Sequence, residues 1–147
     1  MDSADIELRN MTYARMRALG RPPTAVEIAS ATGSSADDVR AGWRRLHDDH
    51  ALVLNQGAAE IRMLNPFSCV PSAYRVHADG RWWYGNCAWD AFGILGALKA
   101  DGRIETSCPD CGDPIVVEVR DGRPYDSRLV FHCMVPARQW WDDIVFT

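Results

Sequence analysis

The sequence has 147 residues, of which 47% are hydrophobic, enough for one domain or two small ones with a packed core. Its formal net charge of −4 gives no general attraction to nucleic acid or to an anionic membrane. No apolar run approaches the roughly 20 residues that span a bilayer, and the acidic N-terminus lacks the apolar core of a signal peptide. We therefore expect a cytoplasmic protein without membrane partners.

The first 64 residues predict three helices followed by a β-hairpin. Apolar side chains recur at helical spacing along the first stretch. A capping box between Thr24 and Glu27 opens a second helix, and Ser35 caps a third. Strand, turn and strand are then predicted over residues 52–64. This order is that of a winged helix, so we predict a winged-helix-like N-terminal domain over residues 1–64.

A winged-helix pattern raises the hypothesis of DNA binding, but the charges oppose it. Residues 1–64 hold 8 Lys and Arg against 9 Asp and Glu. The third helix, which would enter the major groove, begins with Asp37 and Asp38 where base contacts would be needed. We therefore do not expect DNA as a partner. The apolar face of this helix, which includes Trp43 and Leu46, should instead pack inside the protein.

The rest of the chain predicts a mostly antiparallel β domain with one central helix. A two-proline connector at residues 65–71 gives the best domain boundary. The helix is predicted from Cys87 to Lys99, followed by a helical turn at 136–141. Strands are predicted over 73–77, 81–84, 103–106, 115–119 and 128–135, with a last strand beginning at Ile144. The predicted fold class is therefore α+β, with a second domain over residues 65–147.

Cys87 and Asp90 form the strongest candidate for a catalytic pair. The change from an aromatic strand to an Ala-rich helix places Cys87 in the first helical turn. Free N–H groups and the positive end of the helix dipole favour a thiolate there. Asp90 lies one turn further on the same face, where its carboxyl group could relay a proton. The alternative is a small buried cysteine beside a first-turn carboxylate.

Five cysteines in a cytoplasmic protein indicate metal or thiol chemistry more than a disulfide framework. Cys108 and Cys111 look like a zinc knuckle on a turn, which supplies two of the four ligands of a structural zinc. Cys69, His132 and Cys133 are the candidates for the others. The alternative is a tight turn with packed thiols.

Five stretches of the sequence carry a family resemblance, which is most specific around Cys87. The sequence resembles the organomercurial (alkylmercury) lyase family over essentially the whole chain, including the helical N-terminal domain. The stretches are Asn65-Pro66-Phe67-Ser68, Tyr74-Arg75-Val76, Trp83-Tyr84-Gly85-Asn86-Cys87-Ala88-Trp89-Asp90-Ala91, Glu105-Thr106-Ser107-Cys108-Pro109-Asp110-Cys111-Gly112 and Val135-Pro136-Ala137-Arg138-Gln139-Trp140-Trp141-Asp142-Asp143-Ile144.

The resemblance implies an enzyme that cleaves a carbon–mercury bond by protonolysis and releases a hydrocarbon. Cys87 and Asp90 match the family's first catalytic cysteine and its aspartate, so they are expected to act as mercury ligand and proton donor. Cys108 matches a structural cysteine. Mercury, a soft cation that prefers thiolate ligands, would be substrate and product ion, and no organic cofactor is implied. Low-molecular-weight thiols or a thiol mercury carrier are the implied partners.

The family's second catalytic cysteine has no match in this sequence. The resemblance implies that this cysteine would fall just past Thr147. We therefore expect either that the sequence is truncated at its C-terminus or that this relative lacks the second sulfur. Cys133, Cys111 and an external thiol are the candidate replacements.

Two functions outside catalysis stay open at this point. One is a winged-helix transcriptional regulator that senses a soft metal through its cysteines. The other is a non-catalytic metal-binding protein.

Overall fold

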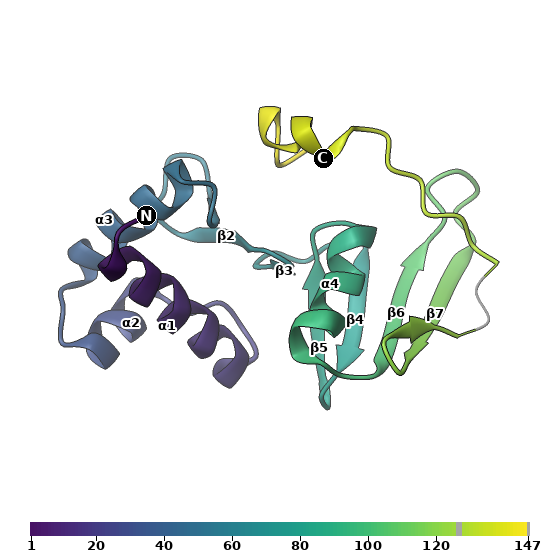
Figure 1. Ribbon diagram of the computed structural model, residues 1–147, viewed down its shortest axis with the longest axis horizontal. Helices are drawn as coiled ribbons and strands as arrows, with labels where there is room; N and C mark the ends of the chain where they lie inside the picture. Colours follow the sequence, from purple (N-terminus) through teal and green to yellow (C-terminus); the bar gives the residue numbers. More distant parts are fainter. Residues whose placement is uncertain (126–127, 147) are drawn as a thin grey trace.

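The computed structural model describes residues 1–125 and 128–146 and places three helices at one end of the molecule (Figure 1). They are α1 (Ser3–Leu19), α2 (Ala25–Thr32) and α3 (Ala36–Asp48). Both predicted helix starts are confirmed. Thr24 and Ser35 each form a complete capping box with the acidic residue three positions on.

The three helices enclose a core around the apolar face of α3. Trp43 and Leu46 are fully buried, as predicted. The indole N–H of Trp43 donates to the Thr12 hydroxyl at 3.1 Å, so the polar atom of this large side chain is satisfied in the interior. Between α1 and α3, the side chain of Arg45 also donates to the buried carboxylate of Asp5.

Within residues 1–125 and 128–146, eight strands form a single sheet in which every neighbouring pair is antiparallel. The strand order is β1-β2-β3-β5-β4-β6-β7-β8. The strands predicted over 73–77 and 81–84 are confirmed, and a tight hairpin turn joins them, with Asp79 and Gly80 both at positive φ. The strands are β1 (Val53–Leu54), β2 (Ile61–Leu64), β3 (Phe67–Ser68), β4 (Tyr74–Ala78), β5 (Arg81–Gly85), β6 (Gly102–Ser107), β7 (Pro114–Arg120) and β8 (Arg123–Pro124).

The sheet continues across the predicted connector at residues 65–71. The short strand β3 lies inside that connector and pairs with β2 on one side and β5 on the other. Three helices followed by the antiparallel pair β1–β2 agree with the predicted order of elements. The winged-helix assignment and the division at residues 64 and 65 stay predictions.

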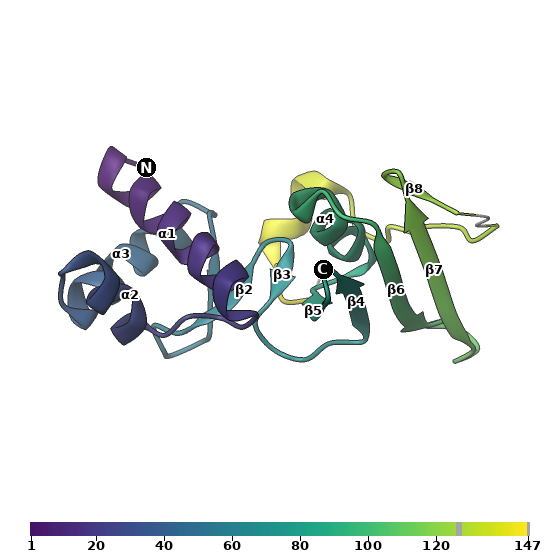
Figure 2. The same ribbon diagram turned by 90° about the horizontal axis from the view of Figure 1, so that it is seen from below.

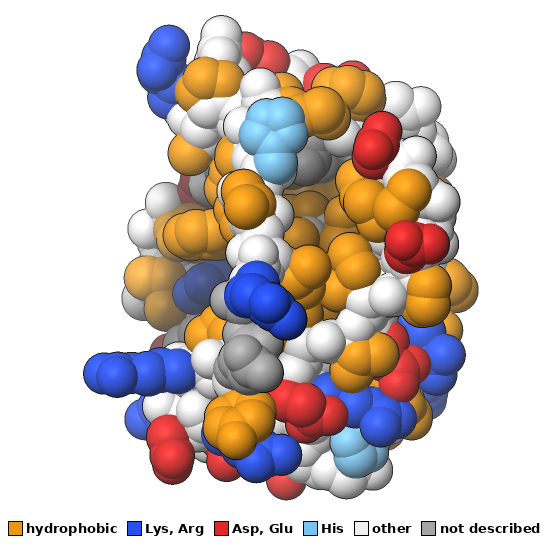
Figure 3. Space-filling view, turned by 90° about the vertical axis from the view of Figure 1, so that its right-hand side faces the viewer, with side chains coloured by type: hydrophobic (Ala, Val, Ile, Leu, Met, Phe, Trp, Pro, Cys, Tyr) orange, Lys and Arg blue, Asp and Glu red, His pale blue; other side chains and the backbone are white. Residues whose placement is uncertain are grey.

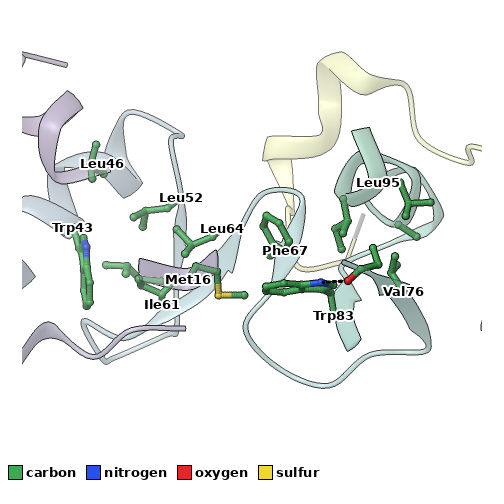
Figure 4. Packing of buried hydrophobic residues seen from close by; sticks show 14 of the residues in the cluster. Met16, Trp43, Leu46, Leu52, Ile61, Leu64, Phe67, Val76, Trp83 and Leu95 are labelled. Carbon is green, nitrogen blue, oxygen red and sulfur yellow. Dashed lines mark hydrogen bonds between the residues drawn. The ribbon is translucent and has the colours of Figure 1, made fainter. Parts of the chain in front are cut away.

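Helix α4 (Ala88–Leu98) is the predicted central helix, and it packs on β4 and β5. Its buried side chains Ala91, Ile94 and Leu95 join the same hydrophobic core as Val76 and Trp83 of the sheet. Figure 4 shows Leu95 above Val76 and Trp83, with the Trp83 indole N–H donating to the Ala78 carbonyl at 3.3 Å. The start of α4 is therefore held firmly against the sheet.

The strands predicted over 128–135 and from Ile144 are wrong. Residues 128–135 are irregular and mostly exposed, with Val130 at 89% exposure, and the residues around Ile144 form a turn. At Val119 and Arg120 the outer edge of β7 is already paired with β8, so no further strand can pair with these two residues. Residues 128–146 instead run back over α4 towards the N-terminal helices (Figures 1 and 2), and the helical turn predicted here is the 3-10 helix Ala137–Asp142.

None of the helices formed by residues 1–125 and 128–146 is both long enough and apolar enough to cross a membrane.

Candidate active site

Cys87 lies at the point where the sheet passes into α4. Strand β5 ends at Gly85, and Cys87 is the N-cap residue of α4 with an extended backbone, φ −148° and ψ −176°. It therefore stands one position before the first turn, whereas the sequence predicted it within that turn. Its side chain makes no capping hydrogen bond. The sulfur is half-buried and close to the N-terminal end of the helix.

The Cys87 thiol is not the stabilised thiolate that the sequence predicted. Burial raises the pKa of the Cys87 thiol above its usual value. The backbone N–H groups of Asp90 and Trp89 act in the opposite direction, but they do not outweigh the lost hydration. Cys87 is therefore expected to be a neutral thiol at neutral pH, until a metal displaces its proton.

Asp90 is a half-buried acid held by Asn86. The Asn86 side-chain amide donates to Asp90 Oδ2 at 2.8 Å and to Asn65 Oδ1 at 3.3 Å. Burial raises the pKa of the Asp90 carboxyl above its usual range, although the hydrogen bonds from Asn86 act to lower it. Asp90 consequently holds its proton to a higher pH than an exposed aspartate, which suits a proton donor.

A cavity of about 240 Å³ brings Cys87 together with Cys133. Cys87, Asn86 and Trp89 come from the β5–α4 junction, whereas Cys133 comes from the segment that crosses above it. Asp90 does not line the cavity, but Asn86 does, and the Asn86 side chain donates a hydrogen bond to the Asp90 carboxyl group. The other lining residues are Tyr74, Ala88, Phe131, His132, Met134, Val135, Trp140 and Phe146.

A second cavity, of about 540 Å³, adjoins the first on the side of β6 and β7. The two cavities share lining residues from α4 and from the crossing segment, among them Trp89 and Phe131. The remaining walls are almost entirely apolar and include Phe92, Ile104 and Val117. Figure 3 looks onto this end of the molecule, where hydrophobic side chains surround a hollow.

The Cys108–Cys111 pair lies elsewhere, on the turn between β6 and β7. Cys69, one of the expected further ligands, is half-buried, and burial raises the pKa of its thiol to about 12. In the part of the chain that the structure describes, no group of three or more His, Cys, Asp or Glu side chains could hold a metal ion. The four-ligand zinc site considered from the sequence is therefore not assembled among these residues.

Thiol reactivity is expected to follow these environments. The backbone N–H groups of Cys111 and Asp110 and the Cys111 side chain lower the pKa of the Cys108 thiol, so more of it is thiolate at neutral pH. Limited alkylation at neutral pH, followed by peptide mapping, should label Cys108 before Cys87 and Cys69 last. Earlier labelling of Cys87 would show that the helix dipole overcomes burial. This order differs from the sequence expectation that the start of the helix favours a reactive thiolate at Cys87.

The structure adds two site residues that the sequence analysis did not identify. Asn86 stands just before the N-cap Cys87, outside α4, so the spacing of side chains along a helix does not predict its hydrogen bond to Asp90. Trp140 lines the cavity from a segment far along the chain, and no local pattern indicates that approach.

Both the fold and the sequence of this chain resemble known proteins. A solved structure described as the mercury-bound form of MerB2 superposes with a TM-score of 0.68 at 22% identity, which is a likeness of fold. The match covers 85% of this chain and 60% of that one, so the chain spans less than two thirds of its length. No curated protein matches the sequence. The model of the MerB family, alkylmercury lyase, matches residues 67–147, more than half of the sequence, and the chain therefore belongs to the alkylmercury lyase family.

Proposed function

We propose that this protein cleaves the carbon–mercury bond of a small organomercurial by protonolysis. One observation carries the proposal. A soft sulfur ligand, Cys87, and a half-buried carboxyl group whose pKa is raised by burial, Asp90, stand within one helical turn at the start of α4. Membership of the alkylmercury lyase family supports the same reaction.

Mercury capture is the first step. The Cys87 thiol displaces a ligand X from R–Hg–X, the sulfur–mercury bond forms, and the thiol proton leaves with X. Mercury is soft and prefers sulfur, so it can displace the proton even though burial raises the pKa of Cys87. The Trp89 and Asp90 N–H groups near the sulfur favour its anionic, metal-bound form.

Protonation of carbon is the second step. The carbon–mercury bond breaks with its electron pair on carbon, and carbon takes the Asp90 proton to release the hydrocarbon R–H. Mercury stays on the Cys87 sulfur, and Asp90 is left as a carboxylate. Asn86 already donates to Asp90 Oδ2, so it would stabilise that carboxylate as it forms. Small thiols or a thiol carrier would then take the inorganic mercury.

The larger cavity supplies a place for the organic group. It adjoins the Cys87 cavity, holds about 540 Å³ and has apolar walls. Transfer of an alkyl or aryl group from water to such walls is favourable by about 25 cal/mol per Å².

We do not propose the regulator function. Asp38 of α3 is engaged in its capping box, and Asp37 pairs with Arg40 at 3.2 Å, which removes a cation that could meet a phosphate. The start of α3 therefore presents acidic side chains that are paired within the helix, and no observation favours DNA binding.

Hydrocarbon release tests the proposal. The protein, incubated with a phenylmercury salt and excess small thiol, should release benzene, measured by gas chromatography. Cys87→Ser should reduce release by at least about 10²-fold, since an alcohol is a poor ligand for mercury. Cys111→Ser, at an exposed cysteine outside both cavities, is the matched control and should keep the parent rate. Equal release from the parent and Cys87→Ser would reject the proposal.

A further inference from the structure

Two cysteines that the proposed reaction does not use lie on the turn between β6 and β7. Cys108 directly follows β6, and Cys111 comes three positions later, before β7 begins. Backbone hydrogen bonds close the turn. The Cys108 N–H donates to the Asp113 carbonyl at 2.8 Å, and the Gly112 N–H donates to the Cys108 carbonyl at 2.9 Å. The turn rests on the six paired positions of β6 and β7, so its backbone is ordered before any ligand binds.

The two sulfur atoms lie within reach of each other across this turn. The Cys111 side chain forms a hydrogen bond with the Cys108 sulfur, and the backbone N–H groups of Asp110 and Cys111 point to the same sulfur. Cys111 is exposed and Cys108 is half-buried. A Cβ atom added at Gly112 would meet no atom of the described residues within 4 Å, so the space beside the turn is open. A thiol in solution can therefore deliver an ion to this pair.

Two thiols without a third ligand suit a thiophilic cation rather than zinc. Among the residues that the structure describes, no third His, Cys, Asp or Glu side chain joins the pair in a metal-binding group. Structural zinc requires four ligands, whereas mercury(II) is soft and is satisfied by two thiolates in a linear arrangement. The Asp110 carboxylate is a hard donor and a poor mercury ligand, but its charge acts on Cys108 and attracts a cation to the turn.

The turn also borders the larger cavity. Ser107 at the end of β6 and Pro109 in the turn line that cavity, whose walls include Trp89 from the start of α4. Figure 1 shows the turn at the end of the β6–β7 pair, close to the chain that follows residue 128. Mercury that leaves Cys87 on a small thiol would therefore meet the two cysteines beside the same cavity.

We propose that Cys108 and Cys111 form a second mercury site, separate from Cys87, which binds inorganic mercury(II) as a two-thiolate chelate. Binding at this site requires nothing from the function proposed above. Only its role as acceptor of the mercury that cleavage leaves behind rests on that function. The pair would hold the ion on the protein surface until a carrier with two thiols of its own removes it.

Loading of the site is a thiol exchange that needs no oxidant or reductant. Two small thiols RSH first remove mercury from Cys87 as Hg(SR)₂, and one of their protons returns to the Cys87 sulfur while the other leaves with the remaining ligand X. Each RS–Hg bond then breaks as a cysteine sulfur–mercury bond forms, and each cysteine proton passes to the departing RS group. The sum is Hg(SR)₂ plus HS(Cys108) plus HS(Cys111) giving S(Cys108)–Hg–S(Cys111) plus two RSH. The high effective concentration of the second sulfur favours the chelate over two separate thiols.

Mercury binding tests the site without any need for activity. The measurements use the Cys87→Ser, Cys133→Ser double variant as background, so that these two thiols do not compete. After incubation with one equivalent of Hg²⁺ and excess monothiol, followed by gel filtration, the background protein should retain mercury, and both Cys108 and Cys111 should resist alkylation. Adding Cys111→Ser should weaken retention by at least about 10²-fold, because chelation is lost. Alkylation of either cysteine in the mercury-treated protein would overturn the site.

A matched variant and a second ion sharpen this test. Asp113→Asn keeps both thiols and the backbone carbonyl that closes the turn, and its side chain is exposed, so retention of mercury should not change. Mapping of the unaltered protein in the same way makes the result independent of the substituted background. Zn²⁺ should be lost during the same procedure, since two thiolates do not fill its coordination shell. Retention of Zn²⁺ as strong as that of Hg²⁺ would reject the two-thiolate assignment.

Cleavage separates this inference from the proposed function. The unaltered protein is given one equivalent of a phenylmercury salt and two equivalents of small thiol, and it should release benzene and then carry mercury on the peptide that contains Cys108 and Cys111. Benzene release with the mercury elsewhere would overturn the acceptor role while the proposed function stands. Binding of Hg²⁺ by the pair without benzene release would reject the proposed function and support the second site. Excess small thiol carries mercury into solution by itself, so the rate measured under that condition does not depend on this pair.

Discussion

Replacing Asp90 by Asn is expected to reduce hydrocarbon release by about 10²- to 10⁴-fold, the usual contribution of a positioned acid. The amide keeps the shape of the side chain and can still accept the hydrogen bond from Asn86, but it has no proton of suitable acidity to give. Binding of inorganic mercury should be unchanged because Cys87 is intact. Gas chromatography of the released hydrocarbon and mercury titration measure the two effects separately.

The pH dependence of the parent protein follows from the same group. Because burial raises the pKa of Asp90, its acid form persists above the usual aspartate range, and release should fall as pH rises through this raised value. In Asp90→Asn that falling limb should disappear. A profile that is identical in the two proteins would show that another group delivers the proton.

The stability of Asp90→Asn checks that the variant is folded. A carboxyl whose pKa is raised by folding stabilises the protein at low pH and loses this contribution as pH rises through the folded-state value. The neutral Asn side chain carries no such cost, so the variant should be at least as stable as the parent at neutral pH. Asp79→Asn, at an exposed turn position with positive φ that Asn tolerates, is the matched control and should keep full activity.

Local signals explain what could be predicted from the sequence. The capping boxes at Thr24 and Ser35 and the hairpin turn at Asp79 are each formed by residues a few positions apart, so their patterns are readable in the chain. The closeness of Cys87 and Asp90 has the same local origin, because Cys87 is the N-cap of α4 and Asp90 stands in the first turn that follows it.

Long-range packing explains which features could not be predicted from the sequence. The two-residue strand β3 exists because β2 and β5 lie on either side of it, and two residues carry no alternation to recognise. The approach of Cys133 depends on Trp89 meeting Phe131 and Trp140, contacts that span more than 40 positions. The raised pKa of Cys87 likewise comes from burial, which the sequence near the helix start does not reveal.

Gly85→Ala is expected to damage both the fold and the site. A Cβ atom at Gly85 would lie 2.8 Å from the Ala91 backbone nitrogen, 3.1 Å from Ala91 Cα and 3.2 Å from the Cys87 carbonyl oxygen. All three are backbone atoms of the junction that carries Cys87, so no side chain can turn aside to make room. Gly85 is also fixed from outside, since its carbonyl accepts from the Ser72 hydroxyl at 2.6 Å and its strand pairs with both β3 and β4.

The start of α4 must therefore move away from β5 when this methyl group is added. Overpacking of this kind costs about 1–3 kcal/mol, which urea unfolding should detect. A displacement of Cys87 and Asp90 by up to about 1 Å should reduce hydrocarbon release by about 10²-fold. Gly96→Ala is the matched control, because its added Cβ meets no atom within 4 Å on an exposed helical position. That variant should keep its activity and gain up to about 1 kcal/mol of stability. If the two variants behaved alike, the close approach of β5 to α4 would have no part in placing Cys87 beside its acid.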